Sequence, residues 1–144
     1  MRHGRWSQPG QAYLVTTTTR RRRPVFNWFE PAWAACRAMH AFARHGDAVL
    51  VAWVLMPDHA HWLLQLGCQE SLSGVVTRLK VTTARNANQV SATSGQVWSR
   101  GFHDRALRRE GDMLIAARYI IANPVRAGLV ADVADYPYWN CIYL

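Results

Sequence analysis

Apolar residues recur along this chain with two different periods, one typical of strands and the other of helices. Residues 12–19 begin with an apolar stretch and continue with four threonines, a β-branched composition that predicts a strand. Residues 48–56 form a near-continuous apolar run, which predicts a strand buried on both faces. A Pro-Asp turn separates this run from a second one at 59–66, so these two strands are predicted to be antiparallel neighbours.

Three segments have the spacing of amphipathic helices, and their ends carry the usual signals. The predicted helices cover residues 31–45, 72–85 and 112–123. Pro31 suits the first turn of the first helix, and Gly46 marks its end. Ser71 and Asp112 are good N-caps for the other two. Pro124 ends or kinks the third helix, because proline pushes the preceding residue out of the α region.

The remaining segments complete a single α+β domain covering residues 1–144. Residues 86–95 are polar and predict a loop, and 96–102 predict a short fourth strand with a glycine break. The resulting order is the doubled split β-α-β unit of ferredoxin-like folds, an antiparallel sheet with helices on one side and an additional C-terminal helix. The first and third strands are then central. We expect a flexible arm at 1–10 and an aromatic tail at 135–144 that packs back over the core.

Two histidines open the third predicted strand. Side chains on a strand alternate between faces, so His59 and His61 project to the same face about 7 Å apart along the chain, whereas Trp62 projects to the other. Such a pair can bind one metal ion. It can equally be two polar residues near solvent at the start of a strand, and the pair alone does not decide between these interpretations.

The charge balance points to a polyanionic partner. The chain has a formal charge of +8, with sixteen arginines, one lysine and nine acidic residues. Arginine binds phosphate with a planar fork, so this bias favours nucleic acid. A high-GC genome would explain the ratio of arginine to lysine but not the excess over acids. The candidate phosphate contacts are Arg20, Arg21, Arg22, Arg23, Arg78, Lys80, Arg85, Arg105, Arg108 and Arg109. The alternative interpretation of the run at 20–23 is a solvated loop that contacts no phosphate.

Other features of the composition exclude several classes of protein. Three cysteines without CxxC spacing predict neither a disulfide framework nor a zinc knuckle, and they favour a reduced, cytoplasmic location. No apolar run is long enough to span a bilayer, and the N-terminus has no signal-peptide pattern. No Ser or Cys lies in a nucleophile elbow. The apolar residues after His61 argue against a metallo-β-lactamase-like site, which needs further acidic and histidine ligands nearby.

Three blocks of sequence together resemble a known family. Residues 55–61, 97–102 and 119–128 resemble the REP-associated tyrosine transposases, which are single-tyrosine HUH enzymes akin to the transposases of the smallest insertion sequences. The resemblance extends from the first strand to at least Val130, with the blocks in the order that the family has. Ala60 departs from it, because relatives usually carry a bulkier apolar residue there. Since Ala60 points away from the histidine face, we expect a packing difference only.

This resemblance implies a bacterial, metal-dependent single-strand DNA endonuclease and strand transferase. Its substrate would be hairpin DNA such as repetitive extragenic palindromes. Tyr119 would be the nucleophile that forms a 5′-phosphotyrosine, and His59, His61 and Asn123 would bind Mg²⁺ or Mn²⁺. Without the resemblance, Tyr119 would be taken for a packing residue and Asn123 for a helix C-cap.

Two other functions remain open from the sequence. A relative that has lost catalysis would bind hairpin DNA or RNA without cutting it. An RNA-recognition module of the same fold class would need exposed aromatic residues on its central strands, and the histidine-bearing strand has only Trp62, on the face opposite the histidines. The sequence is compatible with either a monomer or a homodimer.

Overall fold

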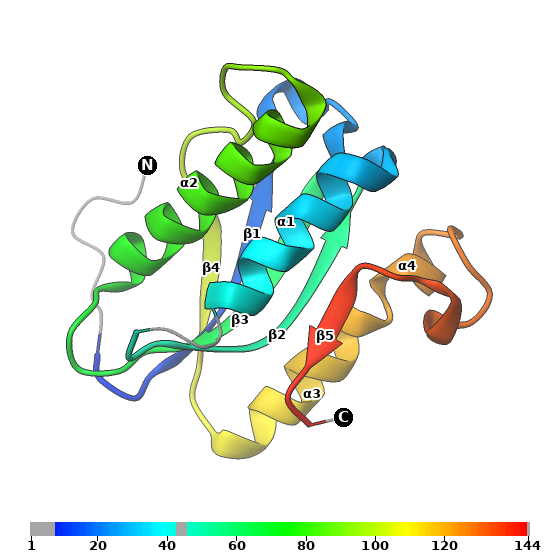
Figure 1. The fold of residues 1–144 in the computed structure, drawn as a ribbon. Helices are drawn as coiled ribbons and strands as arrows, with labels where there is room; N and C mark the ends of the chain where they lie inside the picture. Colours follow the sequence, from blue (N-terminus) through cyan, green and yellow to red (C-terminus); the bar gives the residue numbers. More distant parts are fainter. Residues whose placement is uncertain (1–7, 43–45, 144) are drawn as a thin grey trace.

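The computed structural model describes residues 8–42 and 46–143, which form an α+β fold around one antiparallel sheet (Figure 1). The strands are β1 (Ala12–Thr18), β2 (Val49–Met56), β3 (His59–Gln65), β4 (His103–Leu107) and β5 (Trp139–Cys141), in the order β4-β1-β3-β2-β5. The helices are α1 (Phe29–Phe42), α2 (Leu72–Ser91), α3 (Glu110–Ile121) and the short α4 (Asn123–Arg126), with 3₁₀ turns η1 (Arg20–Arg22), η2 (Val25–Asn27) and η3 (Val133–Asp135). The prediction that β1 and β3 are interior is confirmed.

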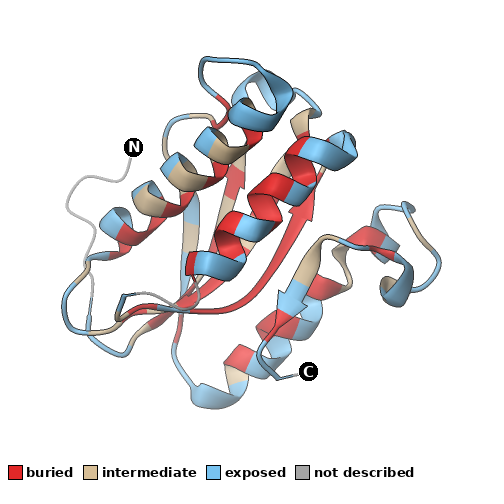
Figure 2. Cartoon of the chain, viewed as in Figure 1, coloured by how far each residue is buried: buried red, intermediate tan, exposed pale blue. Residues whose placement is uncertain are grey.

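Helices cover both faces of this sheet. On one face α1 and α2 turn their buried sides towards the sheet (Figure 2). They pack over alternate residues of β3, where Ala60, Trp62 and Leu64 are fully buried. On the other face, β3 presents His59 and His61, and α3 crosses the same side through residues such as Ile120. The face predicted for each residue of this strand is therefore correct. The sheet also explains why β2 reads as a continuous apolar run, since helices lie over both of its faces.

Helix α2 is longer than the sequence predicted. It begins after Ser71, whose side chain accepts a hydrogen bond from the Gly74 backbone N–H at 3.1 Å, and it continues to Ser91. The prediction of a loop over 86–95 is therefore wrong for 86–91. Ala87 is 1% exposed in the core, so packing of this one apolar side chain holds the last turns of a polar segment in the helix.

The fourth strand lies later in the chain than predicted. Residues 96–102 form only one isolated bridge, between Thr19 and Trp98, and β4 follows at His103–Leu107. Gly101, with a φ of 74°, turns the chain between the two. β4 is an edge strand with a largely exposed surface, so it lacks the apolar alternation on which the prediction depended.

The C-terminal part of the chain differs from the prediction at the start of α3 and in the tail. Asp112 lies inside α3 and not at its N-cap, and its carboxylate accepts a hydrogen bond from the Arg109 backbone N–H at 3.2 Å. The tail packs back over the core as predicted, and it also pairs with β2 as the edge strand β5. The Tyr136 hydroxyl anchors it by donating to the Leu55 carbonyl. Residues 1–7 of the predicted arm lie outside the described residues.

Candidate active site

The two histidines at the start of β3 face each other across a short gap. Their ring centroids are 5.0 Å apart and the rings are nearly perpendicular, at 84°. Nδ1 of His59 is 2.7 Å from a carboxylate oxygen of Asp58, and Nδ1 of His61 is 2.9 Å from the Thr16 hydroxyl. Neither Nε2 atom forms a hydrogen bond with a described residue. The pair therefore presents two ring nitrogens that are available to a ligand.

The partners of the histidines define which nitrogen is available. A carboxylate can only accept, so Nδ1 of His59 donates to Asp58 and Nε2 is the ring nitrogen that faces a ligand. Carboxylate or hydroxyl groups behind a histidine are typical of metal ligands, because they fix the ring orientation. Within 8–42 and 46–143, no three His, Cys, Asp or Glu side chains come together as a metal site. A further ligand from the described residues would therefore be a side chain of another type, such as an amide.

The environment of His61 keeps its imidazole neutral. Burial is the largest cause, and the nearby charges of His59 and Arg126 add to it, lowering the pKa of His61 from 6.5 to about 4. Two opposite effects act on the pKa of the Asp58 carboxyl. Burial raises this pKa, but hydrogen bonding to His59 and the charge of Arg22 together lower it by more, so the pKa is below its usual value. The neutral form of the His61 imidazole is the form that binds a metal ion.

Tyr119 lies on α3 with its ring largely exposed, at 57%. The guanidinium carbon of Arg126, in α4, lies 4.0 Å above the centroid of this ring, which is a cation–π geometry. Helix α3 packs on the face of β3 that also carries His59 and His61, through residues such as Ile120, which lies in the same core cluster as Leu63. The structure thus brings Tyr119 to the side of the sheet that carries the histidines.

Asn123 is the first residue of α4, one turn after Tyr119. The C-cap of α3 is Ala122, so the alternative interpretation of Asn123 as this helix's C-cap is wrong. Its side chain is partly exposed and makes no hydrogen bond with a described residue. The break at Ala122 and Pro124, between α3 and α4, sets the direction in which Asn123 and Arg126 leave the helix. The amide is available as a ligand.

Sequence reasoning missed three residues of this arrangement: Asp58, Thr16 and Arg126. Asp58 was noted only as part of a turn, although a carboxylate next to a histidine pair is a signal for an orienting partner. Thr16 could not be found without the register, which pairs it with His61 across β1 and β3. Arg126 lay within a recognised block of sequence, but its contact with Tyr119 depends on the break between α3 and α4.

The arginine run at 20–23 is an ordered turn beside the histidines. Arg21 and Arg22 adopt positive φ values of 57° and 55°, which non-glycine residues seldom take. Nε of Arg22 lies 3.0 Å from the Asp58 carboxylate, and Arg23 donates to the Gln96 carbonyl at 2.9 Å. Asp58 therefore contacts both His59 and the arginine run. All four arginine side chains are exposed, so most of their charge remains available to a partner.

The other predicted phosphate contacts differ in whether their charge already has a partner within the fold. Arg78 forms a two-point ion pair with Glu70 at 2.7 and 3.0 Å and lies over the Phe42 ring. Lys80 donates to the Ser99 and Gly101 carbonyls, and burial lowers its pKa. These two cations already have partners within the fold. Arg85 is exposed on α2.

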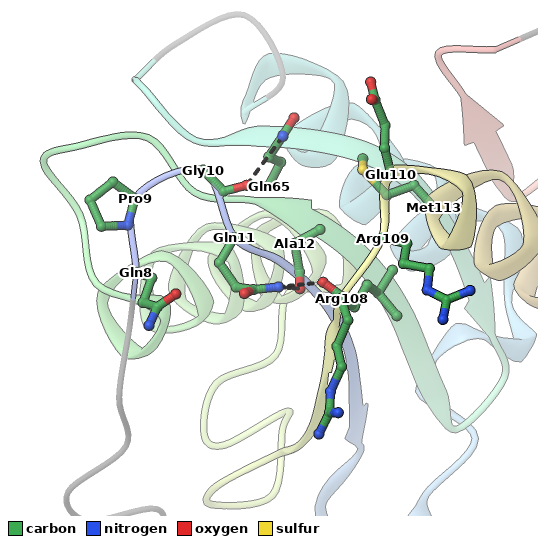
Figure 3. A pocket seen from close by; sticks show the side chains of 11 residues that line it. Gln8, Pro9, Gly10, Gln11, Ala12, Gln65, Arg108, Arg109, Glu110 and Met113 are labelled. Atoms are coloured by element: carbon green, nitrogen blue, oxygen red, sulfur yellow. Dashed lines mark hydrogen bonds between the residues drawn. The ribbon is translucent and has the colours of Figure 1, made fainter.

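Three further arginines lie on β4 or directly after it. Arg105 is on β4, and Arg108 and Arg109 connect β4 to α3. A hollow of about 470 Å³ opens beside Arg108 and Arg109, where β1 begins and β3 ends at Gln65 (Figure 3). In this view Glu110 extends to the opposite side of the connection from the two arginines. Arg108 and Arg109 are thus at the opposite end of β3 from the histidine pair, whereas Arg105 is level with Leu63 in the middle of the sheet.

A comparison with protein-family models identifies the chain. The family described as "Transposase IS200 like" matches residues 8–123, which include both histidines and Tyr119. The chain belongs to the IS200-like transposase family. No helix of this family member within the described residues is both long enough and apolar enough to cross a membrane.

Two relatives of the chain are named as REP-associated tyrosine transposases. The chain is 31% identical over 98 residues to a Haemophilus influenzae protein assigned to the REP-associated tyrosine transposases, covering 61% of this chain and 56% of that protein. It is 31% identical over 91 residues to an Escherichia coli REP-associated tyrosine transposase, covering 60% and 50%. The chain thus spans about half the length of the curated relatives that it matches.

Two solved structures share the fold of this IS200-like chain. A REP-associated tyrosine transposase solved with a REP hairpin superposes with a TM-score of 0.75 at 23% identity, covering 96% of this chain and 81% of that one. A Deinococcus radiodurans protein described as a transposase superposes with a TM-score of 0.59 at 24% identity, covering 83% and 95%. At this identity the likeness establishes the fold alone.

Proposed function

We propose that this IS200-like transposase is a metal-dependent endonuclease and strand transferase for single-stranded, hairpin-containing DNA. One observation carries the proposal: Tyr119 is on α3, which packs on the face of the sheet that carries the histidines, and Arg126 lies over the ring of Tyr119. We take this phenol, the histidine pair and the Arg126 cation as parts of one site. Phosphodiester cleavage needs a nucleophile together with positive charge to stabilise the phosphoryl oxygens.

A divalent ion would be held by Nε2 of His59, Nε2 of His61 and the amide oxygen of Asn123. The free ring nitrogens and the unpaired amide fit such an ion, and phosphate oxygens of the substrate would complete the hard ligands that Mg²⁺ or Mn²⁺ prefers. When bound, the ion would polarise the scissile phosphate. Asp58 and Thr16 keep the two rings oriented, so the site is built in advance on a rigid strand.

The reaction would be an exchange of phosphodiester bonds. The Tyr119 oxygen bonds to the scissile phosphorus and loses its proton to solvent, while the bond to the 3′ oxygen breaks and that oxygen takes up a proton. The products are a 5′-phosphotyrosine and a free 3′-OH, and attack by a 3′-OH reverses the step. A phenol is a weak nucleophile, and the positive charge of Arg126 beside the ring would stabilise the negative charge that develops during attack.

The substrate follows from charge and from the relatives. Exposed arginines lie on both sides of the site, at 20–23 and at Arg105, Arg108 and Arg109, which suits phosphates of a folded DNA strand longer than a dinucleotide. Arg85 adds to this surface. The named relatives are REP-associated transposases, and one neighbour of the same fold was solved with a REP hairpin. We therefore propose a palindromic hairpin with single-stranded flanks as the substrate.

The experiment uses labelled hairpin oligonucleotides with single-stranded flanks. Wild-type protein incubated with DNA and Mg²⁺ or Mn²⁺ should give a cut strand with a free 3′-OH and a denaturant-resistant protein–DNA adduct on its 5′ side. EDTA should prevent both. Tight hairpin binding with no cut under any divalent ion would contradict the proposal and favour the non-catalytic binding module.

A further inference from the structure

The solvent-facing side of α1 has an unusual composition for an amphipathic helix. Most of the helix is buried, which leaves a narrow exposed stripe. A stripe of this kind is normally charged or polar. Here its first two turns carry Phe29, 63% exposed, and Trp33, 48% exposed, and Trp28 precedes them at 69%. Arg37 and His40 continue the stripe. Three neighbouring aromatic rings that are exposed to water form an apolar patch, and such patches usually mark a binding site.

Two of these rings are already arranged as a stack. Phe29 and Trp33 are one helical turn apart, with centroids 6.0 Å apart and planes inclined by only 11°. Below Trp33 a hollow of about 400 Å³ is lined by Trp33, Arg37, His40 and Ala41. A flat ligand would extend the stack on an outer ring face, and the Arg37 side chain lies one turn further along the same stripe.

The start of the stripe lies near the turn that leads into the histidine strand, although α1 itself covers the opposite face of the sheet. The Phe26 N–H, in η2, donates to the Pro57 carbonyl at 3.0 Å, and Pro57 begins the turn that carries Asp58 and His59. The arginine run at 20–23 directly precedes η2, and Arg22 pairs with the same Asp58. A strand of DNA that leaves the histidine site across this turn would meet the arginines and then the aromatic rings.

We infer that Trp28, Phe29 and Trp33 form a stacking platform for unpaired bases of the single-stranded DNA that flanks the hairpin. This inference rests on the proposed function in taking single-stranded DNA as the ligand. Flat aromatic faces next to a row of arginines are the chemistry that binds single strands without regard to sequence. The net charge of +8 opposes pairing of this surface with a second copy of the chain.

The test compares two probes and two variants. A fluorescent hairpin with a single-stranded flank of eight thymidines and the same hairpin with blunt ends are titrated with Phe29→Ala/Trp33→Ala protein, without divalent ions. The control is Tyr143→Ala, which removes an aromatic ring that is equally exposed, at 45%. Loss of base stacking should weaken binding of the flanked hairpin roughly 5- to 100-fold and leave the blunt hairpin unchanged. Tyr143→Ala should change neither.

The conservative variant Trp33→Phe keeps a ring and should retain most of the affinity, which separates stacking from a folding defect. Equal weakening on both probes, or none on either, would overturn the inference. So would normal DNA binding combined with loss of a dimer in light scattering, which would assign the platform to a second copy. The outcome is independent of cleavage: an adduct from wild type with unchanged flank binding by the double variant would refute the platform and leave the proposed function standing.

Discussion

The two faces of β3 are built from alternate residues of one strand, yet they do different work. On the α1 and α2 side Trp62 is fully buried, and its indole N–H donates to the Met39 sulfur at 3.1 Å. On the α3 side His59 and His61 are partly buried, and each keeps one ring nitrogen without a described hydrogen-bond partner. One face supplies stability, and its rigidity positions the chemistry of the other.

This comparison predicts that changes on the two faces have separable effects. The largest should come from the histidine face. His59→Ala/His61→Ala should reduce cleavage at least about 10³-fold, since the ion that the pair would hold is worth several kcal/mol to the transition state. Hairpin affinity should stay nearly unchanged in fluorescence anisotropy, because the phosphate contacts lie elsewhere. The control is His40→Ala on α1, measured at saturating DNA. A double variant that cuts at the normal rate would refute the metal site.

The opposite face should show the reverse pattern. Trp62→Ala should lower the free energy of unfolding by about 3–5 kcal/mol, because it removes a large buried ring that also contacts Trp98 edge-on at 5.7 Å. Urea unfolding measures this change, with His59→Ala as the comparison. His59 is partly exposed, and its substitution should cost less than about 1 kcal/mol. Similar losses of unfolding free energy in the two variants would mean that the two faces contribute equally to stability.

The histidine face should nevertheless contribute to the pH dependence of stability. His61 has a pKa of about 4 in the folded chain, below its ordinary value of 6.5, so the unfolded chain binds the proton more readily. Its contribution is therefore present above pH 6.5 and is lost as the pH falls towards 4, by on the order of 3 kcal/mol. Urea titrations between pH 4 and 7 should show a steeper loss for wild type than for His61→Gln. Parallel curves would contradict the lowered pKa.

The smallest of these effects concerns Arg126. Arg126→Gln should slow cleavage at saturating DNA by roughly 3- to 30-fold, which is the range of a cation–π contact of about 0.5–2 kcal/mol. Arg126→Lys keeps the charge and should be intermediate. Arg118→Gln is the matched control, because it removes an exposed charge next to Tyr119 in sequence that has no described contact with the ring. If both glutamine variants are equally slow, the effect is general electrostatics and not the contact.

The sequence predicted the interior of this molecule better than its edges. Alternation assigned every residue of β3 to its correct face, because both faces of a central strand are constrained. β4 was misplaced because an edge strand needs no apolar pattern, and the last turns of α2 were missed because the burial of Ala87 depends on a tertiary contact. β5 is only three residues long and is defined by pairing with β2, which no local pattern encodes.

The candidate site divides in a similar way. His59 and His61 could be paired from strand geometry alone, and their rings do face each other. The position of Arg126 could not be predicted, because it depends on how the chain turns at Ala122 between α3 and α4. Arg78 illustrates the opposite error: it looks like a phosphate contact in the sequence, but folding places Glu70 beside it.

The most direct test of the account is to find which residue carries the DNA. Wild-type protein is incubated with a flanked hairpin and Mg²⁺, digested and analysed by mass spectrometry, in parallel with Tyr119→Phe. The phenylalanine variant keeps the exposed ring under Arg126 and should fold and bind normally. Tyr13 and Tyr136 are buried, whereas Tyr143 is exposed and serves as an internal control. We predict a nucleotide adduct on Tyr119 alone and neither cut nor adduct in Tyr119→Phe. Cleavage by that variant, or an adduct on another tyrosine, would show that Tyr119 is not the nucleophile.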